Sequence, residues 1–252
     1  MSDYDRNVAA RGFGAARATA IDVGLRAYML RVYNYMAAGV ALTGVVAWVT
    51  YNAAVVTDAA GRITSLTPFG QAIFSGPLAI VLFLGTLGLV FFMSFRINSL
   101  QPSTALMLFM LYAGLLGLML SSVFLAYTGA SITRTFFISA ASFGALSLYG
   151  YTTQRDLSPI GSFLIMGLFG LILAMVVNIF LKSSGLEFAI SAIGVLIFAG
   201  LTAWDTQRIK EMYSVNDDGT IAGRKAVMGA LTLYLDFINL FLFLLRFMGD
   251  RR

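Results

Sequence analysis

The sequence of 252 residues contains no cysteine and no histidine, and its charged side chains are scarce. Without cysteine there is no disulfide framework and no thiolate metal site. Without histidine the chain lacks the commonest general base and the usual pH switch, so any response to pH must come from carboxylates. Charged residues make up 12% of the chain and hydrophobic residues 59%, whereas a typical soluble domain is about 25% charged. This composition argues against a soluble enzyme and predicts a membrane protein.

Long apolar segments follow one another along most of the chain, and the mean hydropathy is +0.83. A helix needs about 20 mostly apolar residues to cross a bilayer. Seven segments meet this length, at residues 31–52, 71–95, 104–127, 132–151, 160–182, 187–207 and 226–248. The sequence therefore predicts an all-α polytopic membrane protein, with a basic tail at residues 1–30 and a seven-helix domain at residues 31–250.

The basic residues indicate how the chain is oriented. With the N-terminus on the inner side, 11 Lys and Arg residues fall inside and 6 outside, as the positive-inside rule requires. A last segment that re-entered on the inner face would change the count to 14 and 3, but its length favours a full span, which we expect. The net charge of +5 fits basic loops beside anionic lipid, and the chain has no basic stripe with interleaved aromatics that would indicate nucleic-acid binding.

Small residues recur three apart inside the apolar segments, where they lie on one helix face. Such notches let neighbouring backbones approach in a membrane, so they predict close helix packing. The pairs are Gly85 and Gly88, Gly114 and Gly117, and Gly167 and Gly170.

Two of the 12 acidic residues, Asp205 and Asp236, lie deep in apolar segments. A carboxylate there costs about 2.5–3.5 kcal/mol on insertion scales, so each is a candidate functional residue. The two segments are consecutive and antiparallel, so the side chains can meet, and their depths match if the sixth helix continues towards Tyr213. Thr202 and Asn239 lie three residues away on the same helix faces as Asp205 and Asp236, respectively.

Two carboxylates that face each other in a dry bundle should not both ionise, so the pair titrates as a unit. When it is protonated, the pair can share a hydrogen bond and draw two helices together. When it is deprotonated, the pair repels unless a hard, oxygen-preferring cation such as Ca²⁺ arrives. Asp205 and Asp236 are thus a candidate proton-sensitive gate and transient cation site, with no tightly bound cofactor expected. The alternative is that each aspartate hydrogen-bonds a neighbouring helix.

Two arginines are candidate partners for these carboxylates. Arg96 ends the second segment and could turn inward as a latch, because arginine offers a bidentate partner to a buried carboxylate. It could equally be an interface arginine that extends to the lipid headgroups. Arg208 lies three residues after Asp205 and competes as a partner on the same helix.

Enzyme signatures are missing from the sequence, and we expect no enzymatic activity. It contains no HExxH, no GxSxG and no P-loop motif. Intramembrane aspartyl proteases also use two membrane aspartates, but the Gly-x-Gly-Asp type of motif is absent here: Asp205 follows Thr-Ala-Trp and Asp236 follows Leu-Tyr-Leu.

Three stretches carry a family resemblance: LYGYTTQRDLS at residues 148–158, TAWDTQRIK at 202–210 and ALTLYLDFINLF at 230–241. They resemble the signature sequences of the bacterial branch of the Bax inhibitor-1 family of membrane proteins. The resemblance implies a seven-helix fold whose last helix packs centrally, and a pH-sensitive Ca²⁺ leak. It also implies that Asp205 and Asp236 form the sensor pair and that Arg96 is the latch of the closed state.

Two functions therefore remain open. The first is a proton-gated Ca²⁺ leak, whose partners are the lipid bilayer, Ca²⁺ and protons. The second is a non-conducting interaction protein that modulates a membrane-anchored protease or a stress or cell-death pathway. The second would depend on surfaces such as the tail and the 208–225 loop, and it would survive Asp236→Asn. In either case the missing histidine and cysteine favour a bacterial inner membrane, with the N-terminus cytoplasmic.

Overall fold

The computed structural model describes residues 3–58 and 63–252, and it describes side chains from residue 23 onwards. The helices are α1 (Asp3–Ala54), α2 (Pro68–Phe74), α3 (Pro77–Arg96), α4 (Pro102–Leu120), α5 (Val123–Ala126), α6 (Gly129–Thr152), α7 (Ser158–Leu181), α8 (Ser184–Glu211) and α9 (Gly219–Met248). Two short strands, β1 (Val55–Thr57) and β2 (Ile63–Leu66), form an antiparallel hairpin, and a 3-10 turn, η1 (Ile97–Ser99), follows α3.

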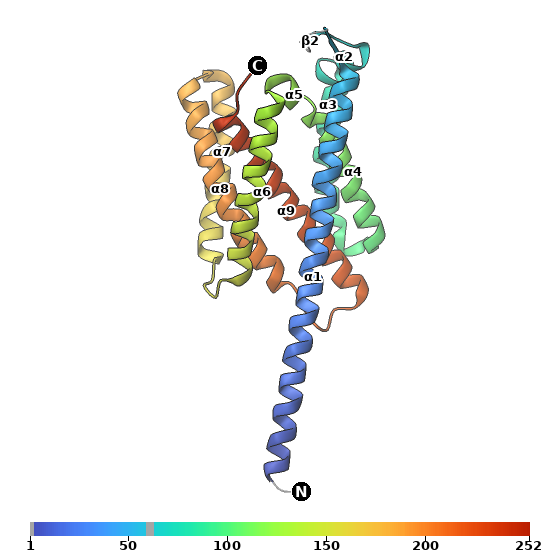
Figure 1. The fold of residues 1–252 in the computed structure, drawn as a ribbon, viewed down its shortest axis with the longest axis vertical. Helices are drawn as coiled ribbons and strands as arrows, with labels where there is room; N and C mark the ends of the chain where they lie inside the picture. The colour runs from blue at the N-terminus through green and yellow to red at the C-terminus, as the bar shows by residue number, and fades with distance from the viewer. Residues whose placement is uncertain (1–2, 59–62) are drawn as a thin grey trace.

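The predicted all-α membrane fold is confirmed. Six of the described helices, α1, α3, α4, α7, α8 and α9, are long and apolar enough to cross a membrane. The remaining predicted span, residues 132–151, corresponds to α6, which has 24 residues, the same length as α7, and packs against α8 and α9 (Figure 1). It is more polar because it buries hydroxyl side chains, including Ser131, Thr135, Ser139 and Ser147.

The helices of the second and third predicted spans, residues 71–95 and 104–127, are each interrupted near one end, although both spans remain long enough to cross a membrane. Residues 71–74 belong to the separate helix α2. The helix is interrupted before Gly76, and α3 begins at Pro77. Proline has no N–H to donate and is favoured in the first turn of a helix, so it marks a start. Likewise α4 ends at Leu120, where the Ser121 hydroxyl turns back to the Leu118 carbonyl, and α5 follows as a separate turn.

The predicted tail continues directly into the first membrane helix. α1 begins at Asp3, and its N-terminal part projects beyond the other helices (Figure 1). The side chains of Arg6, Arg11 and Arg17 lie outside the described ones. Further along, α1 packs against the other helices through buried side chains that include Tyr28, Met29 and Val32.

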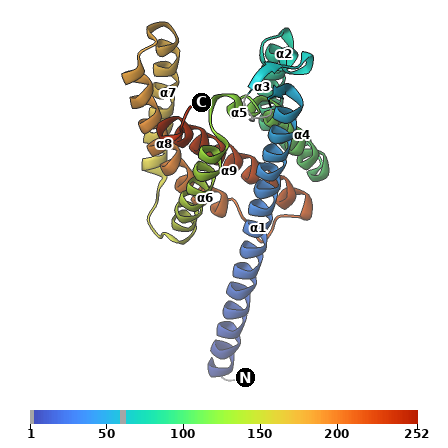
Figure 2. The ribbon, with the colours of Figure 1, turned by 45° about the horizontal axis from the view of Figure 1, so that its top comes forward.

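The long helices form two lobes on either side of α9 (Figures 1 and 2). The first lobe contains α1, α3 and α4, and the second lobe contains α6, α7 and α8, with the main contacts of each helix inside its own lobe or with α9. In its most apolar window α9 is 72% buried inside the protein, against 6% for α7, so the last helix is central as expected.

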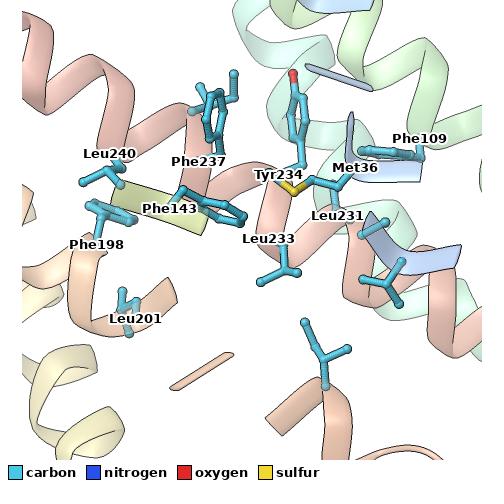
Figure 3. Packing of buried hydrophobic residues seen from close by; sticks show 14 of the residues in the cluster. Met36, Phe109, Phe143, Phe198, Leu201, Leu231, Leu233, Tyr234, Phe237 and Leu240 are labelled. Atoms are coloured by element: carbon cyan, nitrogen blue, oxygen red, sulfur yellow. The ribbon is translucent and has the colours of Figure 1, made fainter. Parts of the chain in front are cut away.

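The core lies along α9, where side chains of both lobes meet it. Figure 3 shows Phe109 beside Tyr234 on the first-lobe side, and Phe143 beside Phe237 on the second-lobe side. The ring centroids of these two pairs lie 5.4 and 5.6 Å apart, and both pairs pack edge to face. This is a favourable arrangement for aromatic rings, so α9 is fixed from both sides.

The last helix crosses the whole bundle, which supports the full span over the re-entrant alternative. It starts at the end of the bundle near the protruding part of α1 and finishes at the opposite end, beside α5 (Figure 1). There the Thr128 N–H donates to the Asp250 carbonyl and the Arg252 N–H to the Ala126 carbonyl, at 3.2 and 3.0 Å. Arg251 forms an ion pair with Glu187 at the start of α8. The chain end thus holds α9 to α5 and to the second lobe.

Candidate functional site

Helices α8 and α9 bring the two membrane aspartates together. α8 extends to Glu211, past the predicted end at residue 207, so Asp205 lies well inside the helix. The Asp218 side chain accepts a hydrogen bond from the Ile221 N–H at 2.7 Å and caps the start of α9. On one side of the aspartates, Phe198 of α8 stacks on Phe243 of α9, with ring centroids 5.6 Å apart, and this contact holds the two antiparallel helices together.

Asp205 and Asp236 face each other across this contact, as the sequence predicted. Their side chains lie within hydrogen-bonding reach of one another. Asp205 is 7% and Asp236 5% exposed. The Oδ2 atom of Asp236 is fully buried and has no hydrogen-bond partner among the described residues. Because two adjacent buried charges of one sign repel strongly, this geometry requires a proton or a cation between the carboxyl groups.

A cavity of about 560 Å³ lies beside the pair, between α7, α8 and α9. Its polar lining includes Asp205, Arg208, Thr232, Asp236, Asn239 and Arg246. The α7 wall is apolar and includes Ile165, Leu168, Ile172 and Met175. The cavity is elongated, because Thr232 and Arg246, both in its lining, are separated by about 21 Å of helix at 1.5 Å per residue.

A second hollow continues this cavity towards the C-terminal end of α9. It has a volume of about 350 Å³, shares Met175 and Arg246 with the first, and reaches Asn178 and Glu187. Polar side chains therefore lie at intervals along the α7–α8–α9 crevice, by which we mean both hollows. Such a line of polar groups inside a membrane protein is typical of an ion pathway.

The positively charged groups of the crevice are held against aromatic rings. The Arg208 guanidinium lies 5.5 Å from the centroid of the Trp204 ring, and the Arg246 guanidinium 5.7 Å from that of Phe243. Arg208 also acts electrostatically on Asp205 from one turn away. The rings thus support both guanidinium groups beside the cavity by cation–π contacts.

The three stretches that carry the family resemblance come together at this site. Gln207 binds the connection between α6 and α7: its Oε1 accepts from the Leu157 N–H and its Nε2 donates to the Arg155 carbonyl, both at 2.8 Å. Lys210 Nζ donates to the Tyr151 carbonyl at 2.9 Å. The first stretch therefore holds the second stretch, and the second presents Asp205 to Asp236 in the third.

Comparisons with known proteins assign the chain to a family. The family model described as "Inhibitor of apoptosis-promoting Bax1" matches residues 25–252. The chain belongs to the Bax inhibitor-1 family. Among its relatives, the Rickettsia prowazekii protein RP147 is 49% identical over 252 residues, covering 100% of both chains. The inner membrane protein YbhL of Escherichia coli K12 is 48% identical over 231 residues, covering 91% of this chain and 94% of YbhL. YrjE of Lactococcus lactis is 39% identical over 227 residues, covering 90% and 92%.

The predicted latch residue lies away from the aspartates. Arg96 is exposed at the end of α3, a helix that packs mainly against α4 in the first lobe. Within the described part of the chain, Arg208 is the arginine that acts on Asp205, and Arg96 does not pair with Asp205 or Asp236. The role of Arg96 therefore stays a prediction, which would require movement of the first lobe relative to α8.

The two predicted polar neighbours differ in their placement. Asn239 lines the cavity beside Asp236, and its Nδ2 donates to the Leu235 carbonyl at 2.8 Å. Thr202 is completely buried, and its hydroxyl donates back to the Phe198 carbonyl at 2.7 Å. Serine and threonine hydroxyls commonly make this bond in membrane helices, so Thr202 is occupied within α8.

Sequence reasoning missed several residues of the crevice. Thr232 lies one turn before Asp236, and Arg246 lies ten residues after it on the same side of α9; both line the cavity. Helical spacing from Asp236 could have indicated both, because residues 232, 236, 239, 243 and 246 follow one face. Trp204 supports Arg208 and packs over Gly161, where a Cβ atom would clash with the indole ring.

Proposed function

We propose that this protein is a non-enzymatic, pH-sensitive cation leak of the bacterial inner membrane, gated by Asp205 and Asp236, with Ca²⁺ as the permeant or transiently bound ion. The observation that carries the proposal is the buried carboxyl pair on the wall of an elongated crevice, with one oxygen left without a partner. The assignment to an inner membrane rests on the name of the relative YbhL, and the basic loops favour a cytoplasmic N-terminus.

The gate follows from the chemistry of the pair. At low pH a proton shared between Asp205 and Asp236 joins α8 to α9 and keeps the crevice closed. As the pH rises the proton leaves, the two negative charges repel, and a hard cation is attracted to the carboxylate oxygens. The pair and the Asn239 amide offer fewer protein oxygens than the six to eight ligands that Ca²⁺ takes. Water completes the shell, as expected for an ion that passes.

The test is Ca²⁺ entry into proteoliposomes from about pH 5 to about pH 8, a range in which a buried carboxylate pair can titrate. We expect the flux of the unchanged chain to rise with pH, and Asp205→Asn or Asp236→Asn to flatten the profile. Asp156→Asn is the matched control. The Ser158 N–H donates to this exposed carboxylate and lowers the pKa of Asp156, which therefore stays ionised across the range.

Two results would contradict the proposal. If the three variants and the unchanged chain share one pH profile, the aspartates do not gate the flux. If the folded protein shows no flux above empty liposomes, the leak itself is wrong. That second result would favour the non-conducting alternative, in which the protein modulates a membrane-anchored protease or a stress or cell-death pathway.

A further inference from the structure

The two lobes leave an open groove between α1 and α6, and none of its lining residues lines the aspartate crevice. The groove has a volume of about 600 Å³. Met29, Leu30 and Tyr33 line it from α1, and Phe143, Gly144 and Leu148 line it from α6. Both figures of the ribbon show α1 and α6 standing apart in front of α9 (Figures 1 and 2). We call this space the interlobe groove.

The lining of the interlobe groove is suited to a hydrocarbon chain. The polar groups at its wall are already bonded to each other: the Tyr33 and Ser147 hydroxyls lie 2.7 Å apart, and those of Ser147 and Thr206 lie 2.9 Å apart. The remaining lining is almost entirely apolar. A polar solute would thus find few unsatisfied partners here, whereas an acyl chain could lie in the groove without desolvating polar groups.

Positive charge is placed at one end of the interlobe groove. Arg26 lines it from the first lobe and is exposed. Lys210 of the second lobe lies behind this end of the groove. Its ammonium group donates to the Tyr151 carbonyl and lies 5.5 Å from the centroid of the Tyr151 ring, which lines the groove. Basic residues between membrane helices at the headgroup level are a recognised arrangement for anionic lipids.

We propose that the interlobe groove binds an anionic phospholipid from the leaflet on the N-terminal side of the membrane. The lipid phosphate lies at Arg26 and Lys210, and one acyl chain runs along Met29, Tyr33 and Phe143. A lipid in this position contacts both lobes and fills space that protein side chains leave open. The site is separate from the aspartate crevice, and the proposal does not depend on any ion flux.

The experiment is native mass spectrometry of the detergent-solubilised full chain with added phosphatidylglycerol or phosphatidylcholine of the same chain length. We expect the unchanged chain to retain phosphatidylglycerol in preference. Arg26→Gln should weaken this binding about fivefold, because one surface cation contributes about 1 kcal/mol to attraction of anionic lipid. Arg31→Gln is the matched control: Arg31 is exposed on the same helix and is not part of the groove lining.

A second pair of variants tests the groove itself. A Cβ atom at Gly144 meets open space, so Gly144→Leu can fill the groove without disturbing the helices, and it should abolish binding of both lipids. Gly170 is an exposed residue on α7 whose Cβ would also meet open space, so Gly170→Leu should bind lipid as the unchanged chain does. Unfolding midpoints of all variants establish that they fold.

Three outcomes would overturn the proposal. The first is equal retention of the two lipids by the unchanged chain. The second is an Arg31→Gln effect as large as that of Arg26→Gln, which would indicate diffuse surface charge. The third is a folded Gly144→Leu variant that keeps its lipid, because the acyl chain would then lie elsewhere.

Discussion

The two lobes contact the same central helix in different ways. The first lobe holds α9 mainly through apolar and aromatic contacts: Phe109 and Tyr112 pack edge to face against Tyr234, with ring centroids 5.4 and 6.0 Å away. The second lobe adds polar contacts, because Asp205 meets Asp236 there. Both faces of α9 are packed, and the face towards the second lobe also contains groups whose charge can change.

In the proposed gate, this difference would separate stability from response within one small bundle. Dispersion contacts between close-packed rings do not depend on pH, so they would keep α9 in place when the carboxyl pair loses its proton. A carboxyl pair gains or loses its mutual attraction with a single proton. The proposed gate thus needs only a movement of α8 and α7 against a helix that the first lobe holds still.

The largest expected effect is in the first lobe. Phe109 is completely buried, and Phe109→Ala should destabilise the protein by about 3–5 kcal/mol, because it leaves a cavity beside Tyr234. The measurement is the unfolding midpoint in detergent. Phe95→Ala is the control, since Phe95 is 81% exposed and should change the midpoint little. Equal effects of the two substitutions would contradict the view that packing in the first lobe fixes α9.

A smaller, local effect is expected where the second lobe is held by polar contacts. Gln207→Ala removes the acceptor of the buried Leu157 N–H, which should cost about 1–3 kcal/mol. We expect faster hydrogen exchange at residues 153–158, measured in detergent, with little change in the first lobe. The exposed neighbour Gln154→Ala serves as the control. Faster exchange across both lobes would show that they do not open separately.

The aspartate pair could be predicted from the sequence because a carboxylate inside a membrane segment has a high free-energy cost. A residue that carries such a cost is usually functional. Only Asp205 and Asp236 among the 12 acidic residues lie deep in such segments. The α7 side chains that line the cavity opposite the aspartates carry no such signal in the sequence. The crevice depends on which apolar side chains of α7 leave space, and apolar side chains look alike in sequence whether they face lipid or protein.

The glycines also show that sequence alone does not reveal where helices pack closely. A Cβ at Gly85 or Gly88 would meet open space, so that predicted notch for close packing is wrong. At Gly150 a Cβ would instead clash with the Ala203 carbonyl beside the aspartate site. Spacing on a helix places residues on one face, but only the tertiary arrangement decides whether that face meets another backbone. The β1–β2 hairpin was also missed, because its strands are only 3 and 4 residues long.

The smallest expected effects compare two tyrosine hydroxyls, one that holds α9 to the first lobe and one that joins the two lobes. Tyr234 bonds Thr43 of the first lobe at 2.6 Å, while Tyr33 of α1 bonds Ser147 of the second lobe at 2.7 Å and so joins the lobes directly. Each Tyr→Phe substitution should cost about 1 kcal/mol, measured by unfolding midpoints. Only Tyr33→Phe should also accelerate hydrogen exchange along α6, because Thr43 keeps its bond to the Ala113 carbonyl when Tyr234 changes. If Tyr234→Phe loosened α6 equally, the two faces of α9 would be coupled, and the fixed and responsive sides would not be separate.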